Sequence, residues 1–131
     1  MKLLLDTHIW IWSVASPERL SRKVVASLES SKNDLWLSPI SVWELLLLVE
    51  KRSVELDRPS EEWIAAAFAA SPLRDAALTR DVAIESRRLK LPHRDPADHF
   101  IAATARVYDL TLVTGDERLL HISGLAVLPN R

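Results

Sequence analysis

Short apolar and polar blocks follow one another along this chain and predict strands that alternate with helices. The mostly apolar runs Lys2 to Leu5 and Leu110 to Val113 are short and β-compatible, and polar residues follow each of them. Other apolar residues recur every four positions, as at Leu20, Val24 and Leu28, which is typical of a helix. The full set of predicted helices is 7–15, 18–30, 40–52, 61–70, 80–89, 97–108 and 117–121, and the remaining predicted strands are 35–37, 73–78 and 125–128. This alternation predicts a mostly parallel sheet with helices on both faces.

Capping residues and prolines mark several of the predicted helix starts. Pro59 and Ser60 precede the helix at 61–70, and Thr79 precedes the helix at 80–89. Asp95 is followed by Pro96, which is the order expected at the N-terminus of a helix. These residues therefore predict that Asp95 caps the helix at 97–108.

Length and composition predict one globular domain over residues 1–131. The chain has 131 residues, 48% of them hydrophobic and 27% charged, which is ordinary for a protein that buries a single core. Because cysteine is absent, disulfides, thiolate zinc sites and cysteine nucleophiles are excluded. The apolar runs are too short for a signal peptide or a membrane span, so we expect a soluble, cytoplasmic protein with no membrane partner.

Acidic residues follow two of the predicted strands. Asp6 comes directly after the first strand, and Asp116 follows the strand at 110–113. Since ligands of open parallel sheets bind at the carboxyl ends of the strands, both side chains are expected in one crevice. Two carboxylates at close range stay ionised only beside a positive charge, and Mg²⁺ or Mn²⁺ meets that need. The alternative is that each Asp is only a helix N-cap, which is the better interpretation of either residue taken singly.

Glu44 strengthens the metal interpretation because it interrupts the apolar run from Val42 to Val49, where an acid gains nothing as a cap. The alternative is a place on an exposed helix face. Asp98 lies one turn after Asp95 and is a further candidate for the site. Thr114 and Ser41 are candidates for hydrogen bonds to the carboxylates, although hydroxyls at strand ends more often bond to the local backbone.

Charge predicts no general attraction to nucleic acid, since the formal net charge is −1. One local basic patch leads directly into Asp95 and is a candidate for RNA binding. It comprises Arg87, Arg88, Lys90, His93 and Arg94. A weaker cluster comprises Arg19, Arg22 and Lys23. A solvated helix face is the alternative for both, and it is the better interpretation of the weaker cluster.

Four segments together resemble the PIN-domain family, and more narrowly the VapC-type toxin ribonucleases of type II toxin–antitoxin systems. They are LLLDTHIWIW, SPISVWELLLL, LPHRDPADHFIAATA and LTLVTGDERLL, and the resemblance covers nearly the whole chain. It implies a three-layer α/β/α domain and a Mg²⁺- or Mn²⁺-dependent endoribonuclease. It also implies a VapB-like antitoxin partner, an RNA substrate and a homodimer.

Carried over segment by segment, the resemblance makes Asp6, Glu44, Asp98 and Asp116 the metal-binding and catalytic residues. A water activated by the metal would attack an RNA phosphodiester, with Glu44 as ligand or as the base that orients the water. His99 departs from the family, because many relatives have Arg there.

Tryptophans suggest where an antitoxin binds. Trp10 and Trp12 lie two positions apart in one predicted helix, so they cannot both face the core. We expect the apolar surface around Trp10, Trp12, Ile40 and Trp43 to contact the partner.

Three other functions use similar residues. A PIN-fold nuclease of DNA or RNA maturation would use the same acids. A receiver-type phosphoacceptor also gathers carboxylates around Mg²⁺ and expects a paired acid on the first strand. It also expects an Asp at the end of the middle strand and a Lys near the end, and both of these are missing here. A non-catalytic interaction module would not bind divalent metal.

Overall fold

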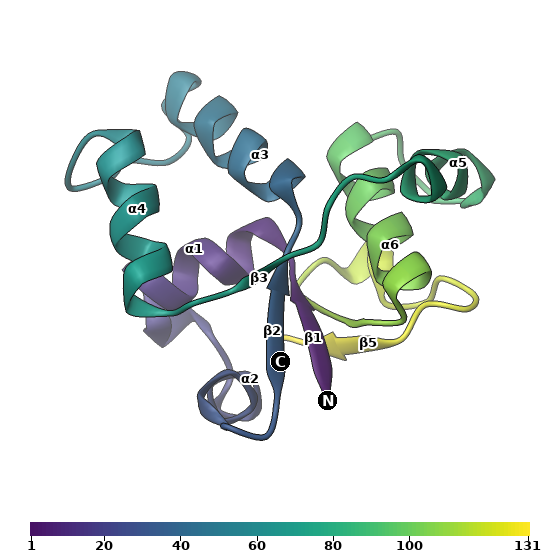
Figure 1. Cartoon of the computed structure of the whole chain (residues 1–131), viewed down its shortest axis with the longest axis horizontal. Helices are drawn as coiled ribbons and strands as arrows, with labels where there is room; N and C mark the ends of the chain where they lie inside the picture. The colour runs from purple at the N-terminus through teal and green to yellow at the C-terminus, as the bar shows by residue number, and fades with distance from the viewer.

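The computed structural model describes residues 1–131 and contains one five-stranded sheet in which every strand pair is parallel (Figure 1). The strand order is β3-β2-β1-β4-β5. The strands are β1 (Lys2–Leu5), β2 (Asp34–Leu37), β3 (Arg74–Asp75), β4 (Thr111–Thr114) and β5 (Val127–Pro129). The α-helices are α1 (Thr7–Ala15), α2 (Arg22–Glu29), α3 (Pro39–Glu50), α4 (Ser60–Ala70), α5 (Arg80–Arg88) and α6 (Pro96–Tyr108). Two short 3₁₀ helices complete the set, η1 (Pro17–Arg19) and η2 (Glu117–Leu119).

Alternate residues of β1 separate the core into two layers, because successive side chains of a strand point to opposite faces of the sheet. Leu3 and Leu5 belong to a cluster with Trp10 of α1. Leu4 belongs to a second cluster with Ile101 of α6. Helices α1 to α4 therefore lie on one side of the sheet and α5 and α6 on the other, as Figure 1 shows, and the predicted three-layer α/β/α fold is confirmed.

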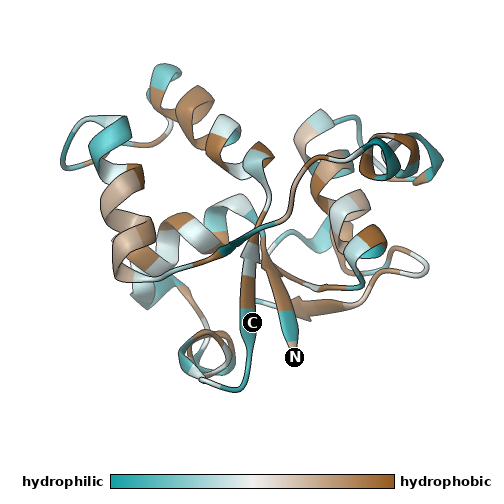
Figure 2. Cartoon of the chain, viewed as in Figure 1, coloured by the Kyte–Doolittle hydropathy of each residue, from teal (hydrophilic) through white to brown (hydrophobic).

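Burial follows the hydrophobic pattern. Leu3 and Leu4 are fully buried, and hydrophobic colour runs along most of β1 and along β5 in Figure 2. Trp10 is also buried, with its ring centre 5.5 Å from that of Trp63 in α4. None of the helices is long and apolar enough to cross a membrane.

Most predicted elements are present, but the helix at 18–30 is not continuous. Leu20 adopts an extended backbone, and the hydroxyl of Ser21 accepts a hydrogen bond from the amide of Val24 at 3.2 Å, so a new helix begins after Ser21. The segment is therefore divided into η1 and α2. The predicted helix at 117–121 is reduced to the single 3₁₀ turn η2, and the strand at 73–78 is reduced to the two residues of edge strand β3.

Pairing of β1 with β4 positions the site. Leu5 lies opposite Val113, and the amide of Asp6 donates a hydrogen bond to the carbonyl of Val113 at 3.0 Å. The residues that follow these two central strands therefore emerge side by side at the carboxyl edge of the sheet. The N-terminal halves of α3 and α6 meet the same edge, so four segments distant in sequence converge there.

Candidate metal centre

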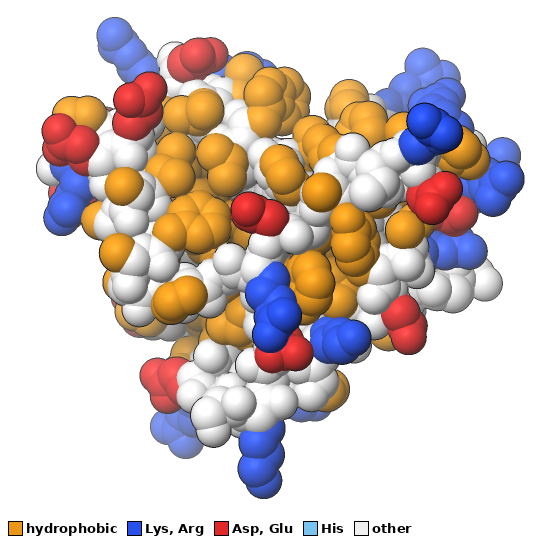
Figure 3. Space-filling view, in the orientation of Figure 1, with side chains coloured by type: hydrophobic (Ala, Val, Ile, Leu, Met, Phe, Trp, Pro, Cys, Tyr) orange, Lys and Arg blue, Asp and Glu red, His pale blue; other side chains and the backbone are white.

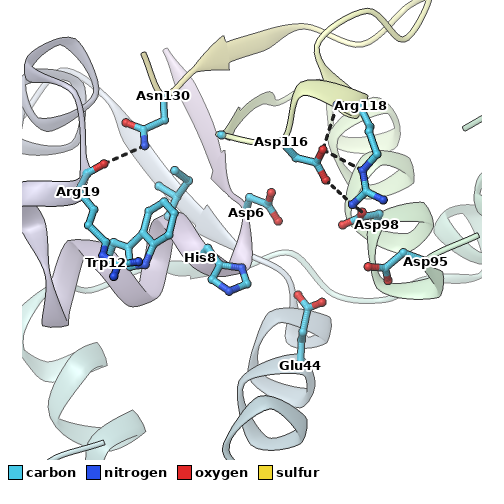
Figure 4. A pocket seen from close by; sticks show the side chains of 12 residues that line it. Asp6, His8, Trp12, Arg19, Glu44, Asp95, Asp98, Asp116, Arg118 and Asn130 are labelled. Atoms are coloured by element: carbon cyan, nitrogen blue, oxygen red, sulfur yellow. Dashed lines mark hydrogen bonds and ion pairs between the residues drawn. The ribbon is translucent and has the colours of Figure 1, made fainter. Parts of the chain in front are cut away.

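A pocket of about 700 Å³ opens at the carboxyl edge of the sheet (Figure 4). Five carboxylates line it, and they come from four separate segments of the chain. They are Asp6, Glu44, Asp95, Asp98 and Asp116. The structure thus brings together all four residues predicted as metal-binding and catalytic, together with the predicted cap Asp95.

Asp6 caps a helix and faces the pocket at the same time. One carboxylate oxygen accepts a hydrogen bond from the amide of Thr7 at 2.9 Å, which caps α1, and the other accepts from the hydroxyl of Thr114 at 2.6 Å. Burial raises the pKa of Asp6, and the bond from Thr114 partly opposes that rise. The predicted contact of Thr114 with a carboxylate is confirmed.

Asp116 is the best compensated acid of the pocket. Its side chain caps η2 by accepting from the amide of Arg118 at 2.9 Å, and it forms two further bonds with the Arg118 guanidinium, at 2.9 and 3.1 Å. These hydrogen bonds lower the pKa of Asp116. The amide of Asp116 also donates to Thr114 Oγ1 at 3.0 Å, so the Thr114 hydroxyl links the acids that follow β1 and β4.

Glu44 reaches the pocket from the second turn of α3, where it is half-buried. Burial raises its pKa, and the neighbouring Thr7 side chain opposes that rise. The Thr7 hydroxyl lies 3.0 Å from the hydroxyl of buried Ser41. Ser41 therefore contacts Thr7 and not a carboxylate, so the expected hydrogen bond from Ser41 to an acid is absent. Ser41 contacts the acids only through Thr7.

Helix α6 carries two acids with different surroundings. Asp95 accepts from the amide of Ala97 at 3.0 Å, which confirms it as the N-cap. Asp98, one turn later, is 6% exposed and lies 2.6 Å from Nε2 of His93. Burial raises the pKa of Asp98 to about 6, against the lowering effect of the His93 hydrogen bond.

Three side chains, two of them lining the pocket, form a compact group of potential metal ligands. His93, Asp98 and Asp116 each bring a potential ligand atom within 4.8 Å of the other two. Asp6 and Glu44 lie outside this group but line the same pocket. Burial raises the pKa values of Asp6, Glu44 and Asp98, so a nearby cation would favour their ionised forms. The oxygen donors of this cluster are those that hard divalent cations prefer. The residues present therefore fit a divalent metal.

The predicted basic patch divides on folding. His93 lies against Asp98 with its Nδ1 buried and without a partner. Lys90 lines a separate groove beside the pocket together with Arg118. Arg87, Arg88 and Arg94 are exposed and line neither cavity, and Arg88 pairs with Glu85 at 4.0 Å.

Sequence reasoning missed several residues of the pocket wall. They are Ile9, Trp12, Arg19, Gly115, Arg118 and Asn130. His8 also lines the pocket. Arg118 was recognisable in principle, because a base two residues after a capping Asp can turn back onto it. Arg19 belongs to the cluster that we interpreted as a solvated face, and only the tertiary fold places it at the pocket.

Comparisons with known proteins agree with the fold. The family model of the PIN domain matches residues 3–125. The chain is 35% identical over 120 residues to Ribonuclease VapC22 of Mycobacterium tuberculosis (strain ATCC 25618 / H37Rv), and the alignment covers 89% of this chain and 88% of that protein.

Solved structures show the same architecture. In the crystal structure of VapBC2 from Rickettsia felis bound to a promoter DNA fragment, the matching chain has a TM-score of 0.74 at 18% identity over 98% of each chain. A toxin–antitoxin complex from Klebsiella pneumoniae matches with a TM-score of 0.67 at 22% identity, again over 98% of each chain. The fold is thus that of a PIN-type α/β domain. The chain belongs to the PIN-domain family, and its resemblance to VapC-type members is confirmed.

Proposed function

We propose that this protein is a metal-dependent endoribonuclease and the toxin of a toxin–antitoxin pair, with residues 1–131 as its single nuclease domain. The observation that carries the proposal is the convergence of Asp6, Glu44, Asp98 and Asp116 in one pocket. Similarity to a protein named as a ribonuclease supports the choice of RNA as substrate. Membership of the PIN family also removes the receiver-type phosphoacceptor interpretation.

The proposed cofactor is Mg²⁺ or Mn²⁺, held by Asp6, Asp98 and Asp116 with Glu44 nearby. When bound, such an ion supplies Lewis acidity toward a phosphoryl oxygen and makes a water molecule a better nucleophile. The chain's own residues prepare the site: Thr114 holds the Asp6 carboxylate, and His93 holds one oxygen of Asp98. This leaves the other oxygen of Asp98 available to the cation.

We assign Glu44 the role of general base. Its burial raises its pKa, so it accepts a proton more readily than a solvent-exposed glutamate. It comes from α3, whereas the proposed metal ligands come from β1, α6 and the turn after β4. A water between Glu44 and those ligands would be oriented for attack on the phosphodiester.

Incubation of the purified protein with total RNA and graded Mn²⁺ or Mg²⁺ tests the proposed function, with cut ends mapped by sequencing. We expect metal-dependent cuts that leave 5′-phosphate ends, and chelation should abolish them. Cleavage confined to flap or stem DNA substrates would indicate a maturation nuclease. Absence of both cleavage and any metal effect on the melting temperature would favour an interaction module and contradict the proposal.

We propose a VapB-like antitoxin as the partner, a homodimer as the assembly and the cytoplasm as the compartment. The relatives with solved structures are toxin–antitoxin complexes, which supports the partner. Hydrophobic side chains gather over α3, α4 and α6 on the face shown in Figure 3, and Trp43 of α3 is 51% exposed. Trp10 is only 1% exposed, so it has no place on the expected contact surface. Trp12, Ile40 and Trp43 stay candidates for it.

Removing the Thr114 hydroxyl tests whether its hydrogen bonds hold Asp6 and Asp116, the acids that follow β1 and β4, in place. We expect Thr114→Val to lower the cleavage rate about tenfold, because the bond to Asp6 is lost while the side-chain shape is kept. Steady-state cleavage of a fixed RNA by Thr114→Val and by Thr111→Val, a control at the start of the same strand, would measure this. Equal rates for the two variants would show that the hydroxyl has no part in the site.

A further inference from the structure

One wall of the pocket carries aromatic and basic side chains in place of acids. His8 and Trp12 come from successive turns of α1, Arg19 comes from η1, and Asn130 follows β5 (Figure 4). In Figure 4 these side chains lie on the opposite side of Asp6 from Asp98 and Asp116. The pocket therefore has an acidic half and a half suited to a different ligand.

The wall is held in place before any ligand arrives. The Nδ2 of Asn130 donates to the carbonyl of Arg19 at 3.1 Å, and its Oδ1 accepts from the amide of Ser21 at 2.7 Å. The amide of Asn130 donates to the carbonyl of Thr114 at 2.8 Å. The η1 turn is thus tied to the carboxyl ends of β4 and β5, which fixes Arg19 relative to the acids.

The Arg19 guanidinium is braced but has no anionic partner. Its Cζ lies 5.4 Å from the ring centre of Trp12, within range of a cation–π interaction. No carboxylate lies within 4.0 Å of it, and its side chain donates no hydrogen bond within the chain. Arg118 on the opposite wall is different, because its guanidinium is bonded to Asp116. The donors of Arg19 are therefore free for an anion that arrives with a substrate.

His8 adds a second flat surface beside Trp12. Its ring is exposed and its centre lies 5.6 Å from that of Trp12, at an interplanar angle of 55°. In complexes with single-stranded RNA, unpaired bases stack on aromatic rings and on guanidinium planes, and positively charged side chains bind the phosphates. The same wall thus offers a phosphate ligand and a surface for a base.

We propose that Arg19, braced by Trp12 and flanked by His8, is a subsite for an unpaired nucleotide next to the scissile phosphate. This inference rests on the proposed ribonuclease function. Arg19 binds the flanking phosphate, and the base lies against the planes of Arg19 and His8. The subsite fixes the direction in which an RNA strand crosses the pocket and restricts cleavage to segments that are free of base pairing.

The test measures binding of a fluorescein-labelled, ten-nucleotide single-stranded RNA by anisotropy, with every protein carrying Asp98→Asn to prevent cleavage. We expect Arg19→Ala to weaken binding about tenfold and to reduce the slope of log affinity against log salt by about 0.7, the contribution of one phosphate contact. Arg19→Lys should keep the slope but lose part of the affinity, because a lysine does not stack in the same way. Arg22→Ala is the matched control, since Arg22 is exposed, lies three residues away and does not line the pocket.

Equal affinities for the Arg19→Ala and Arg22→Ala proteins would overturn the subsite. Cleavage assays with proteins that keep Asp98 distinguish failure of the subsite proposal from failure of the proposed ribonuclease function. If the unmodified chain cuts RNA and Arg19→Ala leaves KM unchanged, only the subsite is wrong. If it neither binds nor cuts RNA, both proposals fall. Melting curves of both arginine variants should match that of their parent, because the Asn130 bond goes to the backbone of residue 19.

Discussion

Asp98→Asn is expected to reduce metal-dependent RNA cleavage by roughly a thousandfold while the protein stays folded. Asp98 belongs to the donor group with His93 and Asp116, and loss of its charge removes several kcal/mol of metal binding and transition-state stabilisation. Asparagine is nearly isosteric, and its amide oxygen can still accept a hydrogen bond from His93 Nε2. The measurement is the rate of cleavage of one RNA in Mn²⁺, with the far-ultraviolet circular dichroism spectrum as a check of folding.

Asp75→Asn provides the matched control for this prediction. Asp75 is an exposed residue of edge strand β3, lies outside the pocket and forms no ion pair, so its replacement makes the same change of charge without touching the site. Its cleavage rate should equal that of the unmodified chain. An Asp98→Asn protein that keeps a tenth or more of the activity would show that Asp98 is not a metal ligand in the reaction.

Local sequence was sufficient to predict the elements around Asp6. Strand Lys2–Leu5 and helix Thr7–Ala15 have the predicted bounds, because an apolar run, a capping Asp and a helix-compatible segment follow each other without interruption. The capping interpretation and the metal interpretation of Asp6 were treated as alternatives. The geometry shows that they are compatible: one carboxylate oxygen caps α1 through Thr7, and the other is held by Thr114 within the pocket.

Elements whose limits depend on tertiary contacts were predicted less well. The segment 18–30 has helical spacing throughout, but Ser21 caps a new helix and Asn130, distant in sequence, bonds to the backbone on both sides of the break. No local pattern contains that contact. For the same reason the sequence did not identify Arg19 as part of the site, since its position depends on where β5 ends.

The sequence was sufficient to predict which acids form the site, but not which side chains form hydrogen bonds with them. Asp6 and Asp116 follow apolar strands, and the parallel topology requires them to meet. The bonding of His93 to Asp98 and of Arg118 to Asp116 depends on the path of two loops, which strand and helix patterns do not determine. Those two contacts change the negative charge of the pocket, so they bear directly on metal binding.

The second large effect is expected in the pH dependence of stability without metal. Burial raises the pKa of Asp98 from 3.8 to about 6. Between those values the folded protein keeps a proton that the unfolded chain has released, so the contribution of Asp98 to stability is complete below about pH 3.8 and is lost as the pH rises through about 6. In a chelating buffer the unmodified chain should therefore melt progressively lower than Asp98→Asn across this range. Melting curves of both proteins from pH 4 to pH 8 measure the difference.

Metal should reverse the sign of this effect. A divalent cation binds the deprotonated carboxylate, so saturating Mn²⁺ replaces the proton and its stabilisation of the folded state grows as the pH rises. An ion present at a hundred times its dissociation constant adds about 2.7 kcal/mol, which would raise the melting temperature of the unmodified chain by several degrees at pH 7.5. Asp98→Asn should gain much less. If Mn²⁺ stabilised both proteins equally at pH 7.5, the cation would be bound elsewhere, and the raised pKa of Asp98 would reflect burial beside His93 and not a site prepared for metal.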